Sequence, residues 1–343
     1  MEVRSTMQIG LFSSTPGSST DLSFLPAVLE SKEAQRQGIT ARWIWSVEEL
    51  DSFRGDCLHL ILSGRLPAAV GERLKAMKVP YVCSVSTILP EVFLRNWLIT
   101  RVSRRAEIQE YCAVLRAAGR ILVHSPAGAW MLERKLGFPK PTFALVTPPI
   151  DERVHQSDPD NFREKYDIGS FILSYAGDYS PYSNTYRLLQ ALEHINVASV
   201  VVGTTSDSEY SADCRRISRT NPRLRLLDEE NRSSGILSSA LSACDLFVDA
   251  TAFGMWNSFV EDVISLGRRS VVSSSARLTP WFGESVEYVE PTSPELIRHG
   301  IVTALNKGPL ASALVSSRHA RSSSQFVEEM VTSYTVAMKS AGR

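Results

Sequence analysis

Three segments of this sequence carry a glycine at or shortly after the end of a short apolar run, and in the first of them small polar residues surround it. They contain Gly17 (SSTPGSSTDLSF, 13–24), Gly177, Asp178 and Ser183 (AGDYSPYSN, 176–184), and Gly254, Met255, Trp256 and Asn257 (FGMWNS, 253–258). Glycine lets the backbone approach a ligand, and a helix that begins after such a loop offers N–H groups to phosphate. The loop at Gly17 alone fits an ordinary turn equally well, because it is not a GxGxxG motif.

Histidines that could transfer protons are scattered along the chain. They are His59, His124, His155, His194, His299 and His319. An isolated histidine is more often a surface or core residue than a catalytic one, so only His124, at the end of an apolar run, is a candidate acid–base group. Asp178 is a second candidate, although it fits the cap of a turn before Pro181 equally well.

Metal ligation is not indicated. The five cysteines are far apart, with no CxxC pair and no histidine at ligand spacing, and no DxD carboxylate cluster follows a strand. We expect reduced, mostly buried thiols and no metal or other cofactor.

The elements that position these loops alternate between short apolar runs and amphipathic stretches. The first set of expected strands comprises 7–12, 41–45, 57–62, 81–85, 120–124 and 143–147. The second comprises 171–177, 198–203, 224–228, 245–250, 270–274 and 286–291. Helical segments lie between them, so the fold class is α/β with two Rossmann-like, doubly wound parallel sheets.

The alternation pauses at residues 147–169, a Pro- and charge-rich stretch without periodicity that we interpret as a linker. The expected domains are therefore 1–150 and 151–324. A final helix at 325–343 carries Phe326, Met330, Tyr334 and Met338 four residues apart. Two domains also fit a length of 343 residues.

Composition favours a globular protein without a strong electrostatic partner. Lys plus Arg and Asp plus Glu are both 37, which gives no reason to expect nucleic acid as a partner. No apolar run approaches about 20 residues and no apolar leader precedes the first strand, so we expect a cytoplasmic location. An apolar set (Phe93, Trp97, Leu98, Ile99) beside Arg101, Arg104 and Arg105 leaves a peripheral membrane contact as an alternative to a buried helix.

The second half resembles the donor-binding domain of family-4 retaining glycosyltransferases, which have the GT-B fold of two Rossmann-like domains facing a cleft. Four ordered segments carry this resemblance: TPPIDERVHQSDPDNFREKYDI (147–168), FILSYAGDYSPYSNTYRLLQAL (171–192), LSACDLFVDAT (241–251) and FGMWNSFVEDVISLGRRSVVSS (253–274). The first half is less similar, and its clearest matching segment is 120–138. The resemblance also implies that the final helix at 325–343 packs back on the first domain. The resemblance implies sugar transfer from a nucleotide diphosphate sugar to an unknown acceptor held on the first domain, with retention of configuration.

The resemblance also assigns residues. The diphosphate loop has Asp178 and Ser183 where the family has Arg and Lys. The two glutamates of its E-x7-E motif fall on Gly254 and Asp262, or on Phe253 and Glu261 after a shift of one residue. A ribose-binding carboxylate is thus implied at Glu261 or Asp262. The histidine that often follows the fourth strand falls on Ser86, the third candidate for a catalytic position.

Two interpretations of these replacements remain open. In the first, the chain is an active transferase in which Arg187 or Arg268 supplies the missing positive charge. In the second, it is a catalytically degenerate partner or chaperone of another glycosyltransferase, which predicts an oligomer or a complex. A third function, nucleotide-sugar epimerisation, needs carboxylates and histidine together in one site.

Overall fold

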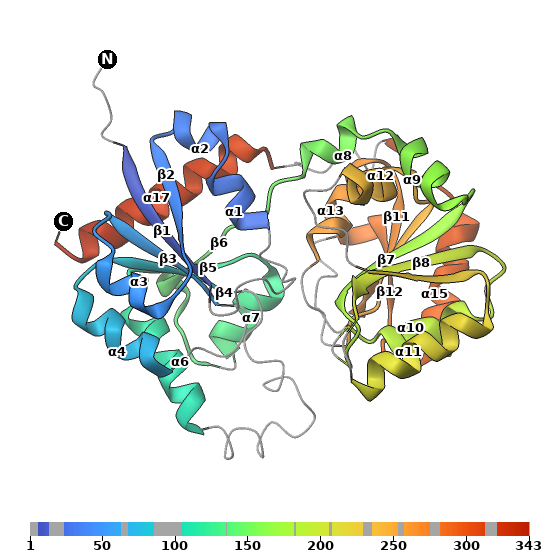
Figure 1. The fold of residues 1–343 in the computed structure, drawn as a ribbon, viewed down its shortest axis with the longest axis horizontal. Helices are drawn as coiled ribbons and strands as arrows, with labels where there is room; N and C mark the ends of the chain where they lie inside the picture. The colour runs from blue at the N-terminus through green and yellow to red at the C-terminus, as the bar shows by residue number, and fades with distance from the viewer. Residues whose placement is uncertain are drawn as a thin grey trace. The chain divides into compact units, whose positions relative to one another are not determined.

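The computed structural model describes residues 6–13, 24–62, 68–85, 105–134, 136–181, 183–205, 208–228, 235–252, 257–274, 282–312 and 321–342. The chain forms two compact units: Met1–Pro149 together with Arg321–Arg343 (unit 1), and Ile150–Ala320 (unit 2). Each unit holds one six-stranded sheet with helices on both faces (Figure 1). All the paired strands are parallel, which confirms the prediction of two doubly wound sheets.

The sheet of unit 1 has the order β2-β1-β3-β4-β5-β6. Its strands are β1 (Met7–Ser13), β2 (Ile39–Ile44), β3 (Cys57–Leu62), β4 (Tyr81–Val85), β5 (Arg120–Val123) and β6 (Phe143–Leu145). Every residue of β3 and β4 is buried, because both faces of the sheet are covered by helices. The continuous apolar runs that predicted these two strands follow from that double burial.

Two layers of helices cover the sheet of unit 1. One face packs against α3 (Val47–Ser52), α4 (Ala68–Met77), α6 (Arg105–Ala117) and α7 (Pro126–Arg134). The other packs against α1 (Phe24–Leu29), α2 (Lys32–Arg36) and α17 (Ser323–Ser340). A 3-10 turn, η2 (Lys140–Thr142), precedes β6.

Helix α17 completes the core of unit 1 from the far end of the sequence. Its N-terminus is fixed by a capping box between Ser322 and Gln325. Phe326, Met330 and Tyr334 are each fully buried against the sheet. At Gly119 a Cβ atom would lie 2.6 Å from the Cα of Ala337, so this close approach of the helix requires glycine.

The sheet of unit 2 has the order β12-β11-β10-β7-β8-β9. Its strands are β7 (Phe171–Asp178), β8 (Ala198–Thr204), β9 (Leu224–Leu227), β10 (Leu246–Asp249), β11 (Arg269–Ser273) and β12 (Val286–Val289). This is the classical Rossmann order, in which the chain direction across the sheet reverses between β7 and β10. The carboxyl ends of these two strands form the topological switch point of unit 2.

Helices also cover both faces of the second sheet. One face packs against α8 (Glu152–Gln156), α9 (Pro159–Tyr166), α12 (Gly235–Ala243) and α13 (Ser258–Ser265). The other packs against α10 (Thr185–Leu192), α11 (Glu209–Thr220) and α15 (Pro294–Lys307). A 3-10 turn, η4 (Gly283–Ser285), precedes β12.

The structure corrects the linker prediction. The stretch 147–169 contains two short helices, α8 and α9, whose Val154 and Phe162 are buried in the core of unit 2. Asp151 caps α8, and Asp158 caps α9 just before Pro159. Helices of one or two turns show little periodicity, so the caps were the only available sequence signal.

Two further expectations concern the thiols and the membrane. All five cysteines are free and buried, as predicted, and burial raises the pKa of the Cys57 thiol to about 12.

None of the helices in the described ranges is long and apolar enough to cross a bilayer. The apolar set at residues 93–99, together with Arg101 and Arg104, lies outside the described residues, and the side chain of Arg105 is likewise not described.

Candidate ligand site at the carboxyl edge of unit 2

The loop after β7 is built around a tight turn. Gly177 has a φ of +70°, at the point where the pairing of β7 with β8 shifts register. The Oγ of Ser183 accepts from the N–H of Ser180 at 3.1 Å and donates to the carbonyl of Ser180 at 2.9 Å. Ser183 is only 5% exposed. Its hydroxyl therefore shapes the loop, and a contact of Ser183 with a donor stays a prediction.

Asn184 ties this loop to two other strand ends. Its Nδ2 donates to the carbonyl of Ala250, after β10, at 2.9 Å and to that of Pro291, after β12, at 2.7 Å. It is fully buried, and its φ of +57° is a conformation that asparagine tolerates better than most residues. Sequence reasoning missed Asn184, although an asparagine just before an amphipathic helix is a recognised cap signal.

Charges of both signs lie beside this loop. Asp178 is exposed, and its Oδ1 accepts from the hydroxyl of Ser180 at 3.1 Å. Arg187, also exposed, lies in the first turn of α10 and donates through Nη1 to Oδ1 of Asn184 at 3.1 Å. Arg187 is therefore a cation at the edge of the sheet where doubly wound folds bind ligands.

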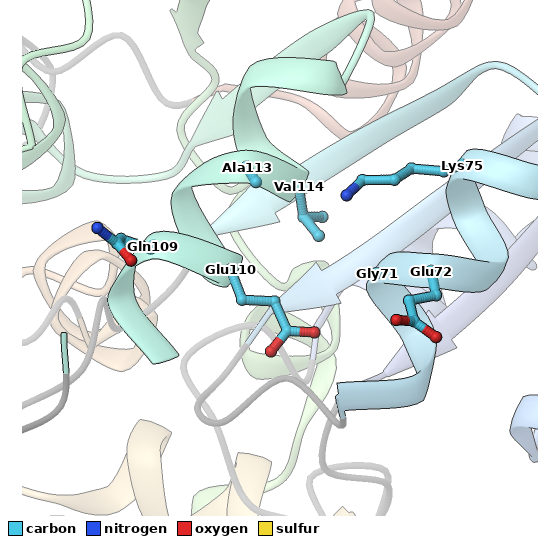
Figure 2. Close-up of a pocket in the computed structure, with 7 residues that line it drawn as sticks. All are labelled: Gly71, Glu72, Lys75, Gln109, Glu110, Ala113 and Val114. Carbon is cyan, nitrogen blue, oxygen red and sulfur yellow. The ribbon is translucent and has the colours of Figure 1, made fainter. Parts of the chain in front are cut away.

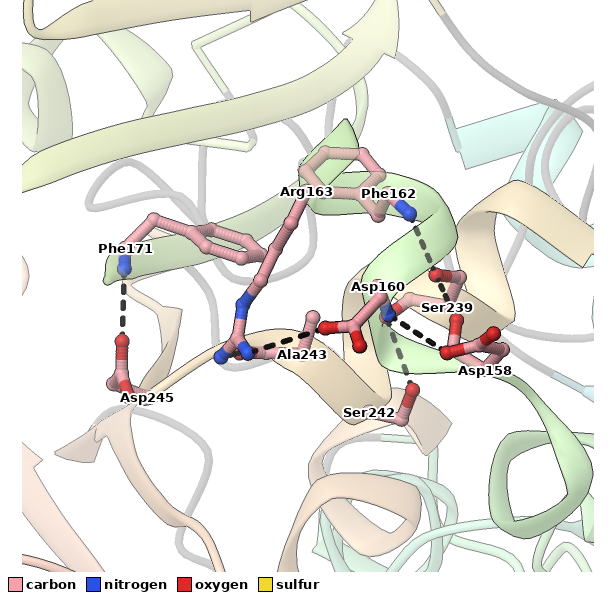
Figure 3. Close-up of polar contacts among 9 residues, drawn as sticks. All are labelled: Asp158, Asp160, Phe162, Arg163, Phe171, Ser239, Ser242, Ala243 and Asp245. Atoms are coloured by element: carbon pink, nitrogen blue, oxygen red, sulfur yellow. Dashed lines mark hydrogen bonds and ion pairs between the residues drawn. The ribbon is translucent and has the colours of Figure 1, made fainter. Parts of the chain in front are cut away.

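Arg268 lies at the opposite edge, which corrects its suggested role. It immediately precedes β11, so it is at the amino end of the strands. Figure 3 shows polar contacts at this same edge, where Oδ2 of Asp245 accepts from the N–H of Phe171 at 2.8 Å. Arg163 donates there to the carbonyl of Ala243 at 2.9 Å. The first contact ties the segment before β10 to the start of β7, and the second ties α9 to the end of α12, so this edge has a structural role.

Helix α13 brings two carboxylates to different environments. Asp262 is fully buried, and its Oδ1 accepts from the N–H of Asp151 at 2.9 Å. Asp262 therefore anchors the segment that enters unit 2 and presents no surface to a ribose. Glu261 is partly exposed in the first turn of α13, beside the N-cap Asn257, whose Oδ1 accepts from the N–H of Phe259 at 3.1 Å. Of the two predicted ribose ligands, only Glu261 is accessible.

Asp249 is a buried acid that sequence reasoning did not single out. It is the last residue of β10 and is 3% exposed. Its Oδ1 accepts from the N–H of Thr251 at 3.4 Å. Burial raises the pKa of Asp249 to about 7, and its contacts with Thr251 oppose that rise only in part.

In unit 1, His124 belongs to a chain of buried hydrogen bonds. Its Nδ1 lies 2.6 Å from the carbonyl of Val146, and its Nε2 lies 2.8 Å from Oγ of Ser84. The same Oγ lies 2.6 Å from Nε2 of His59, whose Nδ1 is 2.8 Å from the hydroxyl of Tyr334. The chain thus joins β3, β4 and β5 to α17.

The direction of every bond in this chain can be assigned. Burial lowers the pKa of His59 to about 3 and that of His124 to about 4, so both rings are neutral at pH 7. A carbonyl only accepts, so His124 donates through Nδ1 and accepts from Ser84 through Nε2. Ser84 in turn accepts from His59, which accepts from Tyr334. His124 is 3% exposed with both nitrogens engaged in structural contacts, and its role in proton transfer stays a prediction.

A surface groove lies between α4 and α6 of unit 1 (Figure 2). It is lined by Gly71, Glu72, Lys75, Gln109, Glu110, Ala113 and Val114. These residues lie on helix surfaces, away from the strand ends, and include two carboxylates with one cation. Such a lining does not favour a phosphorylated ligand.

Several residues implicated by sequence lie outside the described ranges. They are Gly17, Ser86, Gly254, Met255 and Trp256. The described part of the carboxyl edge of unit 2 nevertheless unites the β7–α10 loop, the end of β10 and the start of α13.

Comparison with solved structures shows what this architecture resembles. Sucrose-phosphate synthase from Thermosynechococcus elongatus superposes with a TM-score of 0.68 at 13% identity, with 98% of each chain covered. HepE of Anabaena in complex with UDP-glucose gives a TM-score of 0.68 at 12% identity and 98% of each chain. WaaG, a glycosyltransferase involved in lipopolysaccharide biosynthesis, gives 0.62 at 14% identity, over 97% of this chain and 98% of that one.

These likenesses show the fold. The chain has the architecture of two Rossmann-like domains that these glycosyltransferases share, over nearly its whole length. No protein-family model matches the sequence, and no curated protein matches it either. The family-4 assignment accordingly stays a prediction.

Proposed function

We propose that this chain is a glycosyltransferase that moves a sugar from a nucleotide diphosphate sugar to an acceptor. The observation that carries the proposal is the carboxyl edge of unit 2. There the two loops that resemble family-4 donor loops, 176–184 and 253–258, follow the two strands that flank the switch point. Among the fold neighbours, HepE has been solved with UDP-glucose, which supports the same ligand class here.

The proposed donor contacts follow from accessibility. Glu261 accepts from the ribose hydroxyls, because it is the accessible carboxylate of its pair. The backbone near Gly177 and the start of α13 at Asn257 face the diphosphate, with Gly254, Met255 and Trp256 completing that loop. Arg187 supplies positive charge in place of the Arg and Lys of the family.

The finer features of the proposal rest on the family resemblance. We propose retention of anomeric configuration and catalysis without a metal ion. Gly17 and Ser86 belong to the proposed acceptor-side unit 1, and the acceptor itself is a hydroxyl compound of unspecified class. Asp178 introduces negative charge beside the donor loop, and it is the observation that favours the alternative of a degenerate partner of another glycosyltransferase.

Isothermal titration with UDP-glucose, ADP-glucose and GDP-mannose tests the proposal. Binding of one nucleotide sugar and its loss in Glu261→Ala are expected. Glu164→Ala, an exposed glutamate on α9, is the matched control and should bind as the wild type does. Absence of binding by all three at millimolar concentration would reject the transferase in favour of the partner protein. Equal affinity in Glu261→Ala and the wild type would reject the ribose assignment.

A further inference from the structure

Asp249 lies at the point of unit 2 where a ligand is expected. It ends β10, the strand beside β7 at the switch point, and pairs across to Val272 of β11. In doubly wound sheets, ligands bind beyond the carboxyl ends of the strands at this point. The next residue, Ala250, is held by Asn184 of the β7–α10 loop, so the end of β10 is fixed against the proposed diphosphate loop.

The carboxyl of Asp249 has no positive counter-charge among the described residues. Successive side chains of a strand point to opposite faces of the sheet. Leu246 and Val248 pack on the face covered by α10, α11 and α15, and Phe247 packs on the face covered by α12 and α13. Asp249 therefore lies on the same face as Phe247. Charged or titratable groups stand on four elements packed against β10: β7, β11, α13 and α15. They are Tyr175 and Asp178 of β7, Arg269 of β11, Glu261 and Asp262 of α13, and Glu295, Arg298, His299 and Lys307 of α15. None of these groups contributes to the pKa of Asp249, which burial raises.

Thr251 leaves the same place incompletely paired. Its hydroxyl is buried and interacts with the carboxyl of Asp249, yet it makes no well-formed hydrogen bond to any described group. Buried polar groups in folded proteins are nearly always hydrogen-bonded, so each exception calls for a partner such as a water, an ion or a ligand. An acid with one long hydrogen bond from the Thr251 N–H and an incompletely paired hydroxyl at a switch point therefore indicate that a polar ligand completes the site.

The protonation state of Asp249 decides how it acts on an anion. A diphosphate offers only acceptor oxygens, so an ionised carboxylate next to it repels it, whereas a neutral carboxyl donates a hydrogen bond. A second negative charge brought near the carboxyl also favours its neutral form. Anion binding and protonation of this residue are thus thermodynamically linked.

We propose that Asp249 is a positioning residue that takes up a proton from solvent when a nucleotide diphosphate sugar binds, and that it faces the diphosphate as a neutral acid. This inference rests on the proposed donor function. It specifies how the site accepts a diphosphate without the Arg and Lys that family-4 glycosyltransferases have in this loop. One proton passes from the buffer to the carboxylate, and no covalent bond of the donor changes in this step.

Titration calorimetry with UDP-glucose at different pH values tests the proposal, because the diphosphate diester of this probe does not titrate near neutral pH. Measured in two buffers of different ionisation enthalpy at about pH 8, the wild type is expected to take up close to one proton. Its affinity should fall by up to tenfold for each pH unit above about 7. Asp249→Asn imitates the neutral acid, so it should bind with no proton uptake and a flat pH profile. The matched control is Asp228→Asn, an exposed aspartate after β9, which should behave as the wild type does.

Three results would overturn the inference. The first is binding by the wild type without proton uptake and with a flat pH profile, which leaves the proposed function standing. The second is an Asp249→Asn variant that keeps the pH dependence of the wild type. The third is absence of binding by UDP-glucose, ADP-glucose and GDP-mannose alike across the pH range, which rejects the proposed function as well.

Discussion

The two units handle buried polar groups in opposite ways. In unit 1 the chain Tyr334–His59–Ser84–His124 pairs every ring nitrogen and ends on the carbonyl of Val146. In unit 2, Asp249 is buried with only weak contacts to Thr251. A fully paired network specifies packing, whereas an incompletely paired acid at a strand end has no structural benefit that compensates its burial. The contrast therefore separates a structural cluster from the proposed ligand site.

The contrast also predicts opposite pH dependence. Burial lowers the pKa of both histidines, so the unfolded chain binds more protons and unit 1 loses stability as pH falls below about 6.5. Burial raises the pKa of Asp249 to about 7, so the folded chain binds more protons and unit 2 loses stability as pH rises from about 4 through 7. Acidification should thus destabilise unit 1, and a rise in pH should destabilise unit 2.

The largest effect is expected from His59→Ala. The substitution leaves a cavity and removes the partners of the Tyr334 hydroxyl and Ser84 at once, which should cost about 3–5 kcal/mol. Urea unfolding, followed by hydrogen exchange in β3, β4 and α17, measures the loss. His299→Ala, at an exposed histidine of α15, is the control and should change stability little. A cost below about 1 kcal/mol for His59→Ala would contradict the structural role of the chain.

Asp249→Asn is expected to stabilise unit 2 above neutral pH. The pKa of Asp249 is about 7 against an ordinary value of 3.8, which corresponds to at most about 4 kcal/mol at pH 8. At about pH 4 the difference should vanish, because the carboxyl is then neutral in the folded protein. Thermal unfolding at both pH values checks the prediction. A destabilised Asn variant at pH 8 would show that the ionised carboxylate has a partner.

Acidification of the wild type should weaken unit 1 selectively. Between about pH 7 and pH 5 each buried histidine contributes a loss of about 2 kcal/mol. Hydrogen exchange should accelerate in β3–β5 and not in β7 and β10 over this range. Uniform acceleration in both units would remove the distinction between the two clusters.

A smaller effect is expected from Asn184→Ala. It removes two buried hydrogen bonds, to the carbonyls of Ala250 and Pro291, and places alanine at a φ of +57°. We expect a loss of about 2 kcal/mol and weaker binding of UDP-glucose, because the loop after β7 is no longer tied to β10. Asn221→Ala, the matched control at the end of α11, should leave binding unchanged. If Asn184→Ala binds UDP-glucose with the affinity of the wild type, the hydrogen bonds of Asn184 do not position the proposed ligand site.

Sequence predicted the strands well for a physical reason. Strands β3 and β4 begin and end where expected because their apolar runs reflect burial on both faces. The two short helices of the expected linker were missed because one or two turns carry too little periodicity. The sheet order depends on long-range packing, and the return of the final helix to the first domain was expected only from the resemblance to GT-B proteins.

The site was predicted less completely than the fold. The loop at Gly177 and the start of α13 follow from strand–loop–helix order, but the choice between Glu261 and Asp262 depends on how α13 is rotated against the core. The sequence did not show that the side chains of Ser183 and His124 are enclosed, nor that Arg268 lies at the amino edge of the sheet. Asp249 was missed because an acid that ends an apolar run looks like ordinary loop polarity.

Hydrogen exchange of the full chain with and without saturating UDP-glucose tests the central claim most directly. Slower exchange is expected at residues 177–187 and 257–262, together with the end of β10, while β3–β5 of unit 1 stay unchanged. Unchanged exchange at all three segments of unit 2, with UDP-glucose shown to be bound, would contradict a donor site at this edge.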